Sequence, residues 1–181
     1  MNQIKINRET LYNKIKIAHE KSFYNERKLP NLIAVSKQQA TDKIIKALEC
    51  GHRVFGENKV QEAEKKWLTL RDQYEKVELH LIGHLQTNKV KKAMRIFDFV
   101  HTLDRESLAY EIHKNIKNSR IKSFFVQVNT GMEEQKSGIF PNELEKFLNL
   151  CINKLDLPVI GLMCIPPIGD DPCIHFCYLN K

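Results

Sequence analysis

Long apolar runs are missing from this sequence of 181 residues. No stretch approaches the roughly 20 apolar residues that a membrane-spanning helix needs, and charges interrupt the first residues too often for a signal peptide. Glycine and proline are also few, 7 and 6, which excludes collagen-like and low-complexity chains. We therefore expect a folded cytoplasmic protein. The length suits a single domain, because domains commonly have about 100–200 residues.

Paired cysteines and concentrated charge are also lacking. The 5 cysteines are odd in number and mostly far apart, so we expect no disulfide framework. Cys173 and Cys177 flank His175, but no second close cysteine pair exists, and we expect no metal site. The net charge of +7 is spread along the chain, and its densest part, Lys89–Arg95, is typical of an exposed helix face. A nucleic-acid partner is therefore not expected, and a basic RNA-binding module is the most distant alternative.

What the sequence does contain is a repeated pattern of a short apolar run followed by a helical pattern. Such repetition predicts βα units and a parallel sheet covered by helices, either doubly wound or closing as a barrel. A first helix is expected over residues 7–28, and Gly51 is expected just beyond the end of a helix over Thr41–Glu49 that Thr41 or Asp42 caps. The predicted strand and helix pairs are 32–35 with 41–49, 52–55 with 60–74, 79–82 with 89–94, 97–101 with 105–117 and 123–128 with 142–153, and a sixth strand covers 158–163.

Polar and glycine-containing segments follow the predicted strands, and in parallel sheets the carboxyl ends of the strands form the functional edge. Lys37 follows the first of these strands. It is either a solvated lysine beyond the sheet or a lysine at the rim of an apolar pocket. In the second case poor solvation lowers its pKa, and the free amine can attack an aldehyde to form a Schiff base.

Five motifs occur in order and at compatible spacing between Leu32 and Pro167: LIAVSK, GENKVQEAEKKW, LHLIGHLQTNKVK, QVNTGMEEQKSG and GLMCIPP. Together they resemble the pyridoxal phosphate homeostasis proteins. The resemblance implies an α/β fold, a TIM-like (β/α)8 barrel of the alanine racemase N-terminal type. It also implies binding of pyridoxal 5'-phosphate (PLP) in a role in vitamin B6 balance, without turnover of amino acids.

The same resemblance implies the site residues. Lys37 matches the lysine that holds PLP as a Schiff base, Asn58 of the GEN motif matches a residue beside the cofactor ring, and Met163 of GLM matches the apolar wall of the pocket. The partners implied are the small-molecule cofactor and PLP-dependent enzymes as recipients; we expect a monomer that binds neither nucleic acid nor membrane. Two alternatives stay open: a racemase-like PLP enzyme, for which a second base is missing, and a truncated remnant with little or no PLP binding.

The resemblance stops after GLMCIPP, where the family continues into a seventh and an eighth strand. We expect residues 1–181 to form one barrel domain that lacks the last two βα units. Loops after those strands usually build the phosphate site of such barrels. An incomplete sheet leaves its first and sixth strands as unpaired edges, and we expect lower stability or dependence on a partner.

Overall fold

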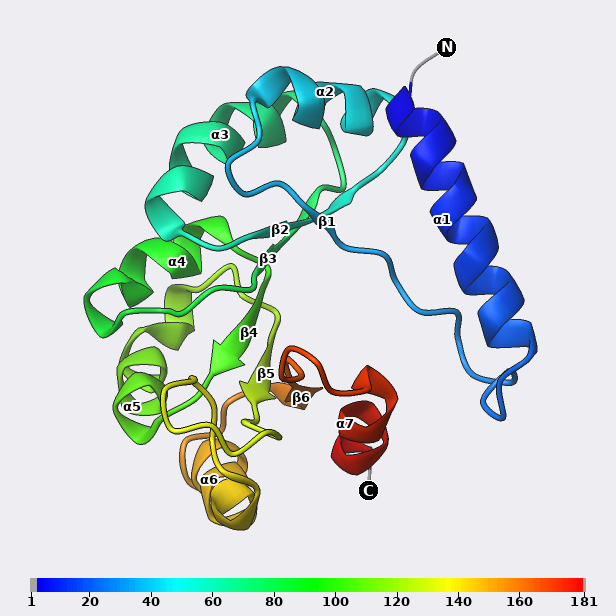
Figure 1. The fold of residues 1–181 in the computed structure, drawn as a ribbon. Helices are drawn as coiled ribbons and strands as arrows, with labels where there is room; N and C mark the ends of the chain where they lie inside the picture. Colours follow the sequence, from blue (N-terminus) through cyan, green and yellow to red (C-terminus); the bar gives the residue numbers. More distant parts are fainter. Residues whose placement is uncertain (1–2, 181) are drawn as a thin grey trace.

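The computed structural model describes residues 3–180, and its centre is one sheet of six parallel strands in the order β1-β2-β3-β4-β5-β6. Each strand therefore pairs with its neighbours in the sequence, as in the wall of a barrel. Figure 1 shows the strands arranged around a common axis, with helices on the outside. The strands are β1 (Ala34–Val35), β2 (Val54–Glu57), β3 (Glu78–Leu81), β4 (Phe99–Leu103), β5 (Ser123–Gln127) and β6 (Val159–Met163).

Helices connect successive strands and cover the outer face of the sheet (Figure 1). The α-helices are α1 (Gln3–Glu20), α2 (Thr41–Glu49), α3 (Val60–Gln73), α4 (Val90–Ile96), α5 (Glu106–Asn115), α6 (Leu144–Asn149) and α7 (Pro172–Leu179). Short 3-10 or π turns, η1 (Thr87–Lys89), η2 (Ile116–Asn118), η3 (Pro141–Glu143) and η4 (Leu150–Lys154), extend helix ends. The predicted α/β fold of about six βα units is confirmed.

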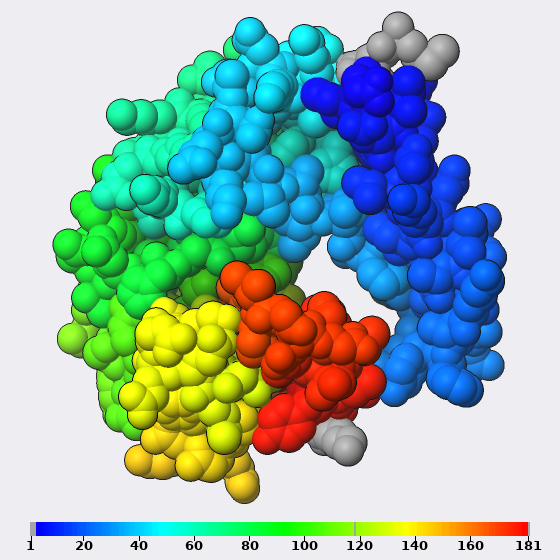
Figure 2. All heavy atoms as spheres, in the orientation of Figure 1, coloured from blue at the N-terminus to red at the C-terminus, as the bar shows by residue number. Residues whose placement is uncertain are grey.

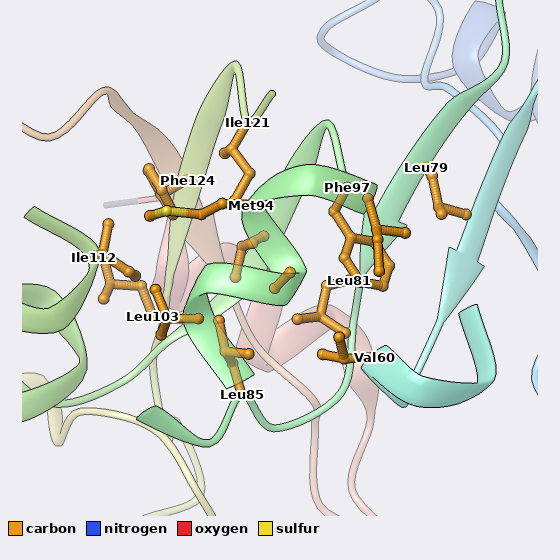
Figure 3. Close-up of a cluster of buried hydrophobic side chains, with 14 of the residues drawn as sticks. Val60, Leu79, Leu81, Leu85, Met94, Phe97, Leu103, Ile112, Ile121 and Phe124 are labelled. Carbon is orange, nitrogen blue, oxygen red and sulfur yellow. The ribbon is translucent and has the colours of Figure 1, made fainter. Parts of the chain in front are cut away.

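The main core lies between the outer face of the sheet and helices α3 to α5. Alternate strand residues such as Leu79 and Leu81 point toward these helices, because successive side chains of a strand point to opposite faces. Figure 3 shows them in one buried cluster with Phe97, Leu103 and Phe124, and all five side chains are 0% exposed. The residues that alternate with them along the same strands face the inner side of the curved sheet.

Several predicted boundaries differ from the structure for local reasons. The helix expected over residues 7–28 is α1, which begins at Gln3 and ends at Glu20, and none of its described residues is buried. The helix over Thr41–Glu49 is confirmed, and Gly51 follows it at a φ of +80°. The predicted cap is wrong: Ala40 occupies the N-cap position of α2 and gives no side-chain hydrogen bond.

The sheet is open, as the sequence predicted, with β1 and β6 at its two edges. Figure 2 shows free space between the C-terminal α7 and the N-terminal α1. Beside β1, an apolar groove of about 330 Å³ runs between α1 and the strand. Among the described residues, no helix is both long and apolar enough to cross a membrane.

Candidate functional site

The carboxyl edge of the sheet brings together the ends of the two motifs LIAVSK and GEN. Val35 of β1 pairs with Gly56 of β2, so Lys37 and Asn58 each lie two residues beyond a paired position on neighbouring strands. Lys37 is exposed and Asn58 is half-buried. Lys37 is thus an exposed residue just beyond the end of β1, and its role in holding a cofactor stays a prediction.

Gly83 lets the next loop approach Asn58 closely. A Cβ atom added to Gly83 would lie 2.2 Å from the backbone oxygen of Asn58 and 2.7 Å from its Cα. No side chain fits at that distance, so the contact requires glycine. The hydroxyl of Thr102 donates to the carbonyl oxygen of Gly83 at 2.8 Å and fixes the loop from the β4 side. Three strands thus hold the backbone around Asn58.

A cavity of about 340 Å³ opens at this edge, inside the range usual for small-molecule sites. Asn58 and Gly83 form one side, and residues from the ends of β4 and β5 form the other. Its polar side chains are three amides, two hydroxyls, an imidazole and a lysine, while Ile82, Val128 and Ile165 supply apolar surface. The full lining is Asn58, Ile82, Gly83, His84, Thr102, Gln127, Val128, Asn129, Lys136, Ser137 and Ile165.

The loop after β5 is built by its own hydrogen bonds. The amide of Asn129 donates to the Glu133 carbonyl oxygen at 2.8 Å and accepts from the Glu133 backbone N–H at 3.2 Å. Lys136 forms an ion pair with Glu133 at 2.5 Å. Met163 ends β6 next to this loop, since it pairs with Gln127 and its carbonyl oxygen accepts from Val128. The third predicted site residue therefore lies at the same edge, but on a strand distant from Lys37 in the sheet order.

A larger cavity, of about 460 Å³, lies at the opposite, amino end of the strands. It is lined by charged side chains that already pair with one another, among them Arg71, Asp98 and Arg120. Function in barrels of this kind resides at the carboxyl end, whereas the amino end serves stability. We therefore assign the candidate site to the smaller cavity.

The inner face of the sheet carries two neighbouring histidines that contact each other. His80 of β3 and His101 of β4 approach to 2.8 Å between Nδ1 and Nε2, and His80 also pairs with Glu78 at 3.1 Å. The ring of His80 stacks on Phe99 at 4.8 Å, and that of His101 stacks on Phe125 at 4.4 Å. Burial lowers the pKa of both histidines, to about 4 for His101. Both rings are therefore neutral at pH 7.

This pair makes stability depend on pH. The histidine pKa in an unfolded chain is near its usual value of about 6.5, above that of folded His101. Between pH 6.5 and 4 the unfolded chain thus binds a proton that folded His101 excludes. The contribution of His101 to the free energy of unfolding should therefore be constant above pH 6.5. As the pH falls from 6.5 to 4, we expect the free energy of unfolding to decrease by on the order of 2 kcal/mol, after allowance for solvent screening.

Urea unfolding at a series of pH values measures this effect. In His101→Gln, which keeps a hydrogen-bonding group without titrating, the decrease between pH 6.5 and 4 should be smaller than in the parent chain. Equal decreases in the two proteins would contradict the assignment to His101.

Sequence reasoning identified the loops of the site but missed the histidine pair. His80 and His101 lie 21 residues apart, and only the pairing of His80 with Phe99 brings them onto neighbouring strands. The parallel register of the predicted strands is the signal that could have revealed them. His175 bonds to Thr130 at 2.9 Å and to Asp170 at 3.1 Å, rather than facing a shared site with its flanking cysteines. No cluster of three metal-ligating side chains is found within residues 3–180.

Comparison with known proteins shows which families and structures this chain is similar to. The family described as "Alanine racemase, N-terminal domain" matches residues 6–178. The chain is 40% identical over 142 residues to the pyridoxal phosphate homeostasis protein of Aquifex aeolicus, covering 78% of this chain and 61% of that protein. It is 35% identical over 169 residues to the protein of the same name from Buchnera aphidicola subsp. Schizaphis graminum, covering 93% and 73%.

Among solved structures, PipY of Synechococcus elongatus PCC7942 without PLP is similar with a TM-score of 0.73 and 33% identity, covering 82% of this chain and 69% of that one. PipY with PLP bound is similar with a TM-score of 0.66 and 28% identity, covering 90% and 74%. The chain spans about three fifths of the length of the first curated relatives that it matches.

Proposed function

Because the chain belongs to the family of pyridoxal phosphate homeostasis proteins, within the alanine racemase N-terminal domain class, we propose that it binds pyridoxal 5'-phosphate in intracellular PLP homeostasis. The observation that carries the proposal is the close contact of Gly83 with Asn58 beside a cavity of about 340 Å³, at the sheet edge where Lys37 follows β1. We propose that the chain is one PLP-binding barrel domain.

The residues present fit such a cofactor. An aldehyde group needs an amine, and Lys37 lies just beyond β1 at the carboxyl edge of the sheet, outside the residues that line the cavity itself. Asn58, which lines the cavity, would offer an amide to the ring, and Met163 at the end of β6 would offer apolar surface from outside the cavity lining. PLP supplies an electron-withdrawing ring and an aldehyde, and Lys37 would hold it as a Schiff base. The side chains of this chain bind and orient the cofactor.

We propose a carrier rather than a catalyst, because the curated relatives are named for homeostasis and not for a reaction. On this proposal the protein works as a monomer in the cytoplasm and releases PLP to enzymes that need it. A racemase-like enzyme is the competing interpretation, and an assay for amino-acid turnover separates the two.

Absorbance spectra test the proposal. Purified protein mixed with PLP should develop the band of a lysine Schiff base at about 420 nm, and Lys37→Ala should lose it, because the proposal places the Schiff base on the Lys37 amine. Lys43→Ala, which removes an exposed lysine from α2, is the matched control and should keep the band. A band of undiminished height in Lys37→Ala would refute the role of Lys37, and turnover of amino acids would refute the carrier.

A further inference from the structure

Next to the backbone around Lys37 lies a cluster of charged side chains from β2 and α3 that the proposed function does not use. Glu57 at the end of β2 is 0% exposed, and the side chain of Lys66 on α3 is 12% exposed. The Lys66 ammonium pairs with Oε1 of Glu62 at 2.6 Å and with Oε1 of Glu57 at 3.4 Å. The indole N–H of Trp67 also donates to Glu57, at 3.1 Å. The cluster Glu57–Lys66–Glu62 is therefore continuous.

This cluster bonds to both neighbours of Lys37. On one side, the hydroxyl of Ser36 donates to Glu57 at 2.7 Å, and the carbonyl oxygen of Ser36 accepts from the Lys66 ammonium at 2.8 Å. On the other side, the backbone N–H of Gln38 donates to Glu62 at 2.5 Å. The residues before and after Lys37 are thus fixed by side chains from β2 and α3.

The backbone at Gln38 shows what the cluster does. Gln38 has a φ of +58°, in the left-handed region that non-glycine residues rarely adopt. Such a conformation persists where surrounding contacts hold it, and it costs of order 1–3 kcal/mol. The bond from its N–H to Glu62 is the contact that holds it here. Hydrogen bonding to Lys66 lowers the pKa of Glu62, so the acceptor is ionised at neutral pH.

Packing alone does not account for these charges. Burying a carboxylate and an ammonium carries a desolvation cost that their attraction often fails to repay, and Oε2 of Glu57 is buried with no hydrogen-bond partner among the described residues. Apolar side chains would fill the same space with less cost. Charged groups retained at this place, bonded on both sides of one lysine, are typical of support for a reactive side chain.

We infer that Glu57, Lys66 and Glu62 are positioning residues that fix the backbone on both sides of Lys37 and so aim its amine at the carboxyl edge of the sheet. This inference rests on the proposed function for its consequence, because the aimed amine is the one that would receive PLP. The arrangement itself exists without the cofactor.

Borohydride trapping of PLP on Lys37, followed by mass spectrometry, tests the consequence. In Lys66→Met the trapping rate should fall roughly 10- to 100-fold, since a displacement of about 1 Å has effects of that size. Lys66→Arg, which keeps a cationic donor, should recover part of the rate. Lys65→Met removes the exposed lysine next in sequence and should leave the rate unchanged. Circular dichroism and thermal unfolding establish that each variant is folded.

Hydrogen exchange of the Gln38 amide tests the arrangement without PLP. This amide should exchange slowly in the parent chain and at least about tenfold faster in Glu62→Ala, because its acceptor is lost. A folded Lys66→Met that traps PLP at the parent rate overturns the inference, as does an unprotected Gln38 amide in the parent chain. If the parent chain traps no PLP while Glu62→Ala still loses amide protection, the positioning holds and the proposed function fails.

Discussion

Gly83→Ala is expected to weaken PLP binding by roughly 100-fold, because the added methyl group displaces Asn58 by about 1 Å. The new Cβ would meet the backbone oxygen of Asn58 at 2.2 Å, its Cα at 2.7 Å and its carbonyl carbon at 2.8 Å. Backbone atoms cannot turn aside as a flexible side chain can, so the loop after β2 must shift. We also expect a loss of about 1–3 kcal/mol in the free energy of unfolding from overpacking.

Gly161→Ala is the matched control for this change. Gly161 lies on β6, and an added Cβ would meet only the ring of Phe125, at 3.2 Å. That ring can move by a few tenths of an ångström, so both effects should be clearly smaller. Titration with PLP and urea unfolding measure them. Equal losses in the two variants would contradict the role of the close contact between Gly83 and Asn58.

Asp98→Ala is expected to remove about 3–5 kcal/mol from the free energy of unfolding, the range for breaking a buried ion pair on one side. Asp98 is 3% exposed and precedes β4 at the amino end of the sheet. Its carboxylate accepts from Arg71, from the backbone N–H of Leu79 at 2.8 Å and from Arg120 at 3.2 Å. Burial lowers the pKa of Arg71, and the charge of Asp98 counteracts this effect.

Without Asp98 the guanidinium of Arg71 remains largely buried, with backbone carbonyl oxygens such as that of Val77 at 2.8 Å as its hydrogen-bond acceptors. Asp98→Asn keeps an acceptor for Leu79 and should lose less. Lys92→Ala, which breaks an ion pair of 2.8 Å between partly exposed side chains, should cost under about 1 kcal/mol. Urea unfolding of the three variants measures the order of their losses in the free energy of unfolding. If Asp98→Ala costs no more than Lys92→Ala, the amino-end cluster does not stabilise the fold.

Much of the fold could be predicted because each βα unit has a recognisable sequence pattern, an apolar run for the strand followed by a helical periodicity. Leu79 and Leu81 of the apolar run 79–82 are buried on the helix side, and the helix over Thr41–Glu49 has Ile44 and Leu48 on its buried face. The predicted ends of helices were wrong where the residues at the end are exposed, because burial then gives no sequence signal for the boundary. Phe23 suggested a longer first helix, yet it is fully exposed and lies beyond the end of α1. The cap of α2 failed because the helix begins at Thr41 itself.

Of the candidate site, the sequence predicted the loops, and the roles of Lys37, Asn58 and Met163 stay predictions. Lys37 and Asn58 stand in recognisable motifs, and the register of β1 and β2 brings them to one edge. The cluster behind Lys37 could not be predicted, since Lys66 and Glu62 are spaced like an ordinary i,i+4 pair on an exposed helix face. Only the folded structure places that pair against the backbone around Lys37.

The most direct test of PLP binding on Lys37 is to map the modified residue in the parent chain. The protein is mixed with PLP, reduced with borohydride and digested, and its peptides are sequenced by mass spectrometry. We predict one predominant modified peptide, labelled at Lys37. Labelling spread evenly over exposed lysines such as Lys43 and Lys65, or no labelling at all, would contradict the account.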